Sequence, residues 1–151
     1  PKKIVVVSSA PQIRYPDCYG IDMAKLEGLV AFRAALELLK ERNLYHIIEE
    51  VYQKSKAQED YMDADVVNYV KEIYAPFTDQ EISDKIAEML TPDNTKAEVK
   101  IIYQTVQDLH KACPKTLGDW YFTGDYPTAG GNRVVNRAFM NFYEGKDARA
   151  Y

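Results

Sequence analysis

Cysteine is scarce in this chain of 151 residues, where Cys18 and Cys113 are the only two. Two isolated cysteines offer neither a metal-binding pair nor a disulfide framework, so we expect a reduced, cytoplasmic setting. No apolar run approaches the length that crosses a bilayer, which argues against a membrane partner. The net charge of −4 leaves no excess of positive charge, which argues against a nucleic-acid partner.

The start of the chain is its most informative part. Residues 4–7 (IVVV) are all β-branched, and they break into a loop over residues 8–22 that contains serine, proline and glycine. Such a run predicts an inner strand of a parallel sheet. Ligands of open α/β sheets bind outside the carboxyl ends of the strands, so residues 8–22 are a predicted ligand-binding loop. Because an inner strand needs neighbours, we also expect this chain to be part of a longer protein.

The chain as a whole has the composition of a globular domain, with 46% hydrophobic and 28% charged residues. Thr78 and Glu81 have the spacing of a capping box. Apolar spacing predicts helices over residues 24–41, 44–52, 66–74, 78–90 and 132–142. Residues 98–113 fit two interpretations: one helix, or a strand over 99–103 followed by a helix from Thr105.

Residues 8–23 read Ser-Ser-Ala-Pro-Gln-Ile-Arg-Tyr-Pro-Asp-Cys-Tyr-Gly-Ile-Asp-Met. This string closely resembles a segment of the glutamine phosphoribosylpyrophosphate amidotransferases, which catalyse the first committed step of purine synthesis. Residues 101–112 are similar to the next strand and helix of that family, which favours the strand interpretation. Residues 121–151 are similar to the long C-terminal form of some members.

The resemblance implies a helix-rich α/β fold: a fragment of a type I phosphoribosyltransferase-like parallel sheet, with one or two strands, a helical insertion and C-terminal helices. Residues 1–42 would end the phosphoribosyltransferase-like domain, with a strand, a pocket loop and a helix. Residues 43–97 would form the helical insertion. Residues 98–151 would supply a strand, a helix and the C-terminal helical tail.

Catalytic residues of that family have no counterpart here. Its phosphoribosylpyrophosphate loop follows a strand that ends in two acidic residues, with a Gly-Thr-Thr-like turn. Neither Glu49-Glu50 nor Glu59-Asp60 has that context. The amino-terminal cysteine nucleophile for glutamine hydrolysis is missing from these residues as well. We therefore expect no catalytic residue and no cofactor within this chain, and magnesium ligands elsewhere in the parent enzyme.

The resemblance places the loop at the ribose and nucleotide end of the transferase pocket. Arg14 would offer a guanidinium fork to a phosphate, and tyrosines would stack on a purine; the plainer alternative is a rigid loop with Arg14 in a surface ion pair. The candidate ligand-binding residues are Ser8, Ser9, Arg14, Tyr15, Tyr19 and Asp22. Cys18 and Leu29 align with the wall of the family's ammonia channel, although Leu29 also fits an ordinary core position.

Two further candidates are weaker. The Gly130-Gly131 turn before a helix matches a phosphate-binding helix start, but an ordinary helix start explains it better. His46 and His110 stand alone on predicted helices without partners at metal-ligand spacing, so we expect no metal site.

These observations predict the C-terminal portion of an amidophosphoribosyltransferase that is inactive alone. Its expected partners are the upstream glutaminase and phosphoribosyltransferase segments of the parent chain, phosphoribosylpyrophosphate, purine nucleotides and further copies in a homo-oligomer. Two alternatives stay open. One is a self-standing helical interaction module, and the other is a regulatory purine-nucleotide-binding domain.

Overall fold

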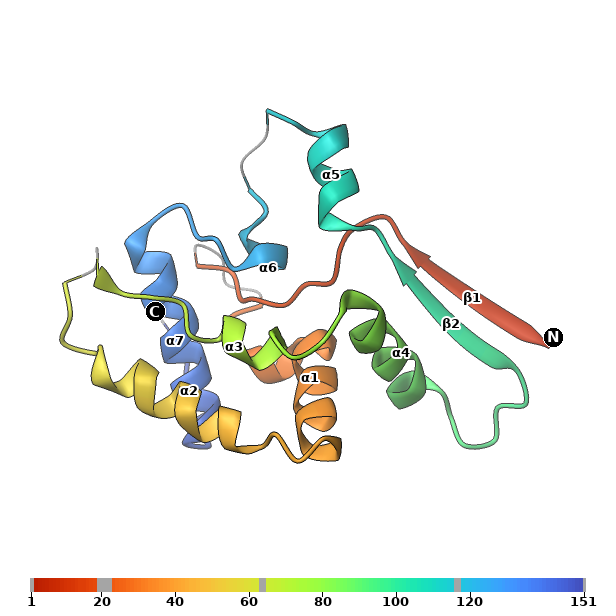
Figure 1. Ribbon diagram of the computed structural model, residues 1–151, viewed down its shortest axis with the longest axis horizontal. Coiled ribbons are helices and arrows are strands. Elements are labelled where there is room, and N and C mark those ends of the chain that lie inside the picture. The colour runs from red at the N-terminus through yellow and green to blue at the C-terminus, as the bar shows by residue number, and fades with distance from the viewer. Residues whose placement is uncertain (1, 19–22, 63–64, 116–117, 151) are drawn as a thin grey trace.

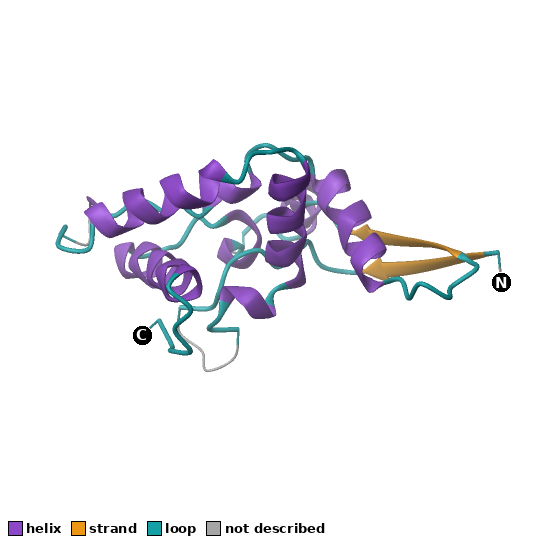
Figure 2. Ribbon diagram, turned by 90° about the horizontal axis from the view of Figure 1, so that it is seen from below, coloured by secondary structure: helices purple, strands orange, loops and turns teal. Residues whose placement is uncertain are grey.

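The computed structural model describes residues 2–18, 23–62, 65–115 and 118–150, which form a helix-rich mixture of helices and strands. Strands β1 (Lys3–Ser8) and β2 (Glu98–Tyr103) pair in parallel and project as an arm from the helical body (Figures 1 and 2). Their register aligns Lys3 with Glu98 and Ser8 with Tyr103. Residues 98–113 are therefore a strand followed by a helix.

The helical body lies mostly between the two strands in the sequence. After β1 come the 3₁₀ turn η1 (Leu26–Gly28) and helices α1 (Val30–Glu41), α2 (His46–Ala57), α3 (Lys71–Tyr74) and α4 (Asp79–Leu90). After β2 come α5 (Val106–Ala112), α6 (Trp120–Thr123) and α7 (Ala129–Tyr143). Everything from η1 to α4 is thus one long crossover between parallel strands.

Helix α1 lies at the centre of the core. It packs against α4, and α2 packs against α7. The ring of Phe32 on α1 meets Phe139 and Phe142 of α7 edge to face, with centroids 6.2 and 5.0 Å apart. One cluster of buried residues joins parts of residues 1–42, 43–97 and 98–151, so these three segments share a core.

The helix expected over residues 24–41 starts later, at Val30. Leu29 is extended, with φ −87° and ψ 117°, and the turn before it is a 3₁₀ turn that contains Gly28. Glycine weakens a helix by lacking a side chain that restricts the backbone. The break lets Leu26 and Leu29 both enter the core, with exposed fractions of 0% and 7%.

The helix expected over residues 66–74 is also shorter, because side chains bind the backbone of its first half. Gln58 accepts a hydrogen bond from the Val67 amide and donates one to the Val67 carbonyl, at 3.0 and 2.7 Å. Asn136 of α7 donates to the same carbonyl at 2.7 Å. With these groups already bonded, residues 66–69 stay outside the helix and α3 spans only Lys71–Tyr74.

Helix α4 begins with the capping box that the sequence predicts. Thr78 Oγ1 accepts from the Glu81 amide at 3.2 Å, and the Glu81 carboxylate accepts from the Thr78 amide at 2.7 Å. The Glu81 carboxylate also pairs with Arg42 at the end of α1. These hydrogen bonds, that from Arg42 first, lower the pKa of Glu81 to about 2. Glu81 therefore joins the start of α4 to α1.

We expect this carboxylate to make stability depend on pH. Because the folded state lowers the pKa of Glu81, its contribution is complete above the unfolded pKa of about 4.3 and is lost as the pH falls towards about 2. Urea unfolding of the wild type and of Glu81→Gln should show a stability difference at pH 7 that narrows on acidification. A difference that stays constant between pH 7 and about pH 2.5 would contradict this assignment.

Candidate functional site

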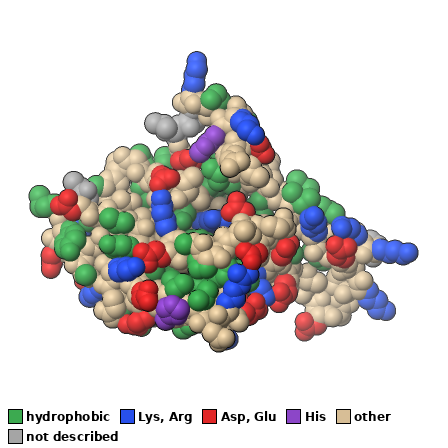
Figure 3. Space-filling view, viewed as in Figure 1, with side chains coloured by type: hydrophobic (Ala, Val, Ile, Leu, Met, Phe, Trp, Pro, Cys, Tyr) green, Lys and Arg blue, Asp and Glu red, His purple; other side chains and the backbone are tan. Residues whose placement is uncertain are grey.

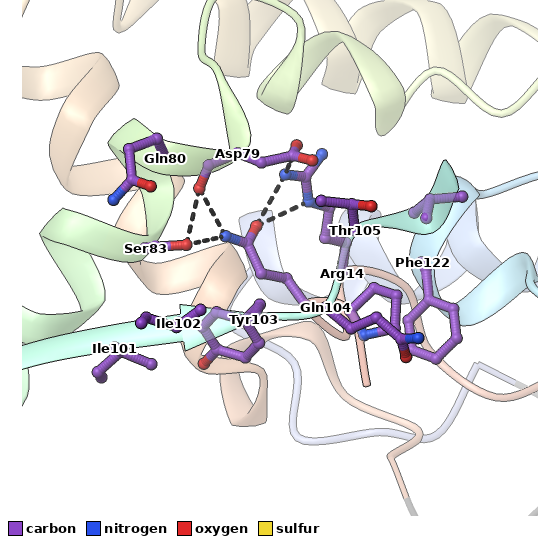
Figure 4. A pocket seen from close by; sticks show the side chains of 13 residues that line it. Arg14, Asp79, Gln80, Ser83, Ile101, Ile102, Tyr103, Gln104, Thr105 and Phe122 are labelled. Carbon is purple, nitrogen blue, oxygen red and sulfur yellow. Dashed lines mark hydrogen bonds and ion pairs between the residues drawn. The ribbon is translucent and has the colours of Figure 1, made fainter. Parts of the chain in front are cut away.

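A cavity of about 250 Å³ lies at the carboxyl ends of the two strands (Figure 4). Its walls come from four places: the loop after β1, the first turns of α4, the chain that leads from β2 into α5, and Phe122 of α6. We call this cavity the crevice. Its lining includes the side chains of Gln12, Arg14, Asp79, Ser83, Gln104 and Phe122.

Gln12 links the loop after β1 to α4. Its amide nitrogen donates to the Asp79 carbonyl at 2.8 Å and to Ser83 Oγ at 2.7 Å. The Ser83 hydroxyl donates in turn to the Asp79 carbonyl at 2.8 Å. Gln12 is only 4% exposed. Because it is buried and hydrogen-bonded to α4, its side chain is held in one conformation.

Arg14 is held against the same network. Its Nε and Nη2 donate to Gln12 Oε1 at 3.1 and 2.7 Å, and Nη2 pairs with Asp79 Oδ1 at 2.6 Å. The guanidinium also lies over the Tyr74 ring, 5.2 Å from its centroid. Dashed lines in Figure 4 trace the contacts around Arg14, Asp79 and Ser83. Asp79 is 68% exposed, so the ion pair itself adds little stability, and the network mainly orients Arg14.

The backbone of the loop is anchored from three sides. Amides of Arg14 and Tyr15 donate to the Tyr121 carbonyl at 2.8 and 3.1 Å. Tyr74 of α3 donates its hydroxyl to the Arg14 carbonyl, and Tyr126 donates its hydroxyl to the Pro16 carbonyl, both at 2.6 Å. The loop is therefore fixed by groups that lie about 60 to 110 residues away along the chain.

Tyr15 points into the core rather than into the crevice. It is 3% exposed and meets the Tyr74 ring edge to face, with centroids 5.4 Å apart. Burial raises the pKa of both phenols well above the ordinary value. Neither ring lines the crevice.

Ser8 closes β1 with a local turn, in which its hydroxyl donates to the Ala10 carbonyl at 2.9 Å and accepts from the Ala10 amide at 3.2 Å. Ser9 is exposed at the bend that follows. Tyr19 and Asp22, the two remaining candidates for ligand contact, lie outside the described residues.

The two residues aligned with the ammonia channel occupy different surroundings. Leu29 belongs to the core cluster, where it precedes α1. Cys18 is partly exposed at the far end of the loop. Neither lines the crevice.

Sequence reasoning missed Gln12, Asp79 and Ser83. The capping box located the start of α4, but no local pattern indicates that this helix start faces a loop 65 residues earlier. Gln12 lies within the string that carries the resemblance, but the sequence does not indicate whether its side chain is buried or exposed. Their roles come from tertiary packing alone.

The histidine His110 lies on the surface, apart from the crevice. His110 Nε2 lies 2.7 Å from Asp119 Oδ2, which makes a pair on the surface. Within residues 2–18, 23–62, 65–115 and 118–150, no three His, Cys, Asp or Glu side chains form a group that could hold a metal ion. In the same ranges, no helix is both long and apolar enough to cross a membrane.

Comparison with known proteins adds no relative: no protein-family model, no curated protein and no solved structure matches this chain.

The contact between α7 and Tyr126 can be tested with two adjacent glycines. A Cβ on Gly131 would lie 2.5 Å from the Tyr126 Cβ, whereas a Cβ on Gly130 would meet nothing within 4 Å. Gly131→Ala should lower the free energy of unfolding by about 1–3 kcal/mol through overpacking. The matched Gly130→Ala should leave it equal or raise it by up to about 1 kcal/mol. Equal effects in urea unfolding would contradict the packing of Tyr126 on this helix.

The buried hydroxyl of Tyr74 should affect stability in two ways. Tyr74→Phe leaves the Arg14 carbonyl without this partner and should cost about 1–2 kcal/mol near neutral pH. Burial raises the pKa of Tyr74, so the wild type loses stability above about pH 10, where only the unfolded state ionises. The gap between the two proteins should thus narrow from pH 8 to about pH 10.5 in urea titrations. A gap that widens at alkaline pH would refute this assignment.

Proposed function

We propose that this chain is the C-terminal portion of a glutamine phosphoribosylpyrophosphate amidotransferase. The whole enzyme would move glutamine-derived ammonia onto C1 of phosphoribosylpyrophosphate, release pyrophosphate and form phosphoribosylamine for purine synthesis. The primary support is the resemblance over residues 8–23, with the weaker similarities over residues 101–112 and 121–151.

The structural observation that supports the proposal is the exposure of β1. Its four aliphatic residues alternate between two faces, yet all are open to solvent: Ile4 39%, Val5 48%, Val6 50% and Val7 69%. Figure 3 shows hydrophobic side chains at the base of the arm and charged ones towards its tip. Parallel strands are normally covered on both faces, so a strand of this composition suits the interior of a larger sheet.

Strand β2 has the opposite character. Glu98 and Lys100 are exposed on one face, while Ile101 on the other face is 8% exposed where β2 packs against α4. Charged residues are typical of the edge of a sheet, where they discourage further pairing. We infer that β2 is the outer edge and that the remaining strands of the parent sheet would pair with the free edge of β1.

In that arrangement the crevice would lie at the carboxyl edge of the complete sheet, where ligands of α/β proteins bind. Arg14 would contribute to the pocket wall from the loop, and Tyr15 would support the loop from the core. Ser8 and Ser9 lie at the start of the loop, outside the crevice lining, and would contact only a ligand that extends beyond the crevice. Residues 43–97 would be a helical insertion into the phosphoribosyltransferase-like domain. The phosphoribosylpyrophosphate loop, the magnesium ligands and the cysteine nucleophile would come from other segments of a cytoplasmic, homo-oligomeric parent.

The position of β1 can be tested with Val7→Lys. In the 151-residue chain, where Val7 is 69% exposed, this substitution should change the free energy of unfolding by less than about 1 kcal/mol. In the whole enzyme it should place an unpaired charge inside the sheet and abolish soluble expression. Lys100→Ala on β2 is the control that both proteins should tolerate. A whole enzyme that also tolerates Val7→Lys would remove this support.

A test of the activity requires the full-length native protein that contains this sequence. Purified with its full length, it should release pyrophosphate from phosphoribosylpyrophosphate in the presence of glutamine and magnesium, and the 151-residue chain alone should not. A native product no longer than these residues and without that activity would overturn the proposal and favour the helical interaction module.

A further inference from the structure

We propose that helix α4 positions the loop after β1, and that Gln12 is the positioning residue through which it acts. The inference deepens the proposed function, on which it depends for one point only, namely that this loop forms a wall of the phosphoribosyl pocket. It assigns a role to a helix of the insertion, for which the sequence offered no chemical account.

The carboxamide of Gln12 suits this role because both of its ends are engaged. Its nitrogen donates to two acceptors on α4, the Asp79 carbonyl and Ser83 Oγ, and its oxygen accepts from Arg14 Nε and Nη2. A carboxylate at this position would keep the contact with Arg14 and lose both donations to α4. Gln12 therefore joins the loop to α4, and the pair of Arg14 with Asp79 adds a second link between the same two parts.

The position of α4 is set independently of the loop. Ile82 and Ile86 are fully buried, and α4 packs against both α1 and β2. Charged pairs add to the link with α1, between Glu81 and Arg42 and between Lys85 and Glu41. The helix is therefore held in place by its own packing. The hydrogen bonds of Gln12 to this helix fix the position of the loop and the orientation of the Arg14 side chain.

Holding the loop in one conformation should favour ligand binding, because the loop is then preorganised. A ligand that contacts a loop already held in one conformation loses less free energy to ordering than one that must fix a mobile loop. Releasing Gln12 from α4 should therefore weaken ligand binding while leaving the reacting groups, which would lie in other segments, unchanged. This effect separates a positioning role from a contribution to global stability.

The first test uses the 151-residue chain and amide hydrogen exchange. The amides of Arg14 and Tyr15, which bond to the Tyr121 carbonyl, report on the loop, and the amide of Phe139 in α7 reports on the core. In Gln12→Glu, exchange of the two loop amides should accelerate about tenfold while that of Phe139 stays within about twofold. Ser83→Ala, which removes one acceptor on α4, should give a smaller change in the same amides.

Asp84→Ala is the matched control. Asp84 is exposed on the same helix, next to Ser83, and bonds only to Gln80 among the side chains described. It should leave the exchange of the loop amides unchanged. Unchanged loop exchange in Gln12→Glu would overturn the proposal, and so would equal acceleration of loop and core amides, because Gln12 would then only stabilise the fold.

The second test uses the full-length enzyme. Gln12→Glu should raise the KM for phosphoribosylpyrophosphate about tenfold and change kcat by less than about twofold, as expected when a binding loop loses its support. A loss in kcat alone would count against positioning. Where the wild type shows no transferase activity, the proposed function fails, and the exchange experiment still decides whether α4 positions the loop. The two ideas can therefore fail separately.

Discussion

The parallel pairing of β1 with β2 is the constraint on which the rest of the structure depends. Parallel neighbours cannot be joined by a tight turn, so the chain must leave β1, cross over and return to start β2 at the same end. Here the crossover runs from the loop after β1 through η1 to α4, and α5, α6 and α7 follow β2. Because α4 is its last element and packs against β2, the crossover ends beside the strand that it leads to.

This topology explains why the loop after β1 is so firmly held. The loop is the first part of the crossover and α4 is the last, so the two meet at the carboxyl end of the strands. Their contact is polar, and the buried carboxamide of Gln12 is bonded at both ends, as a buried polar group requires. The C-terminal segment completes the support through the Tyr121 carbonyl and the Tyr126 hydroxyl.

The two strands of the arm differ in how far their faces are covered. Helix α4 covers one face of β2, whereas both faces of β1 stay open in this chain. The two strands also differ in composition, since β1 is mainly aliphatic and β2 is partly charged. Under the function proposed above, further strands would pair with the free edge of β1.

Several elements were predictable from the sequence by itself, because their causes are local. The run Ile4 to Val7 indicated a strand, and Thr78 with Glu81 marked the start of α4 to the residue, since a capping box needs only neighbours in the chain. Tertiary contacts decided the rest. Pairing with β1 made residues 98–103 a strand, bonds from Gln58 and Asn136 kept residues 66–69 out of a helix, and packing brought Gln12 to Ser83. These features depend on contacts between groups that are far apart in the chain, and a local sequence pattern does not indicate such contacts.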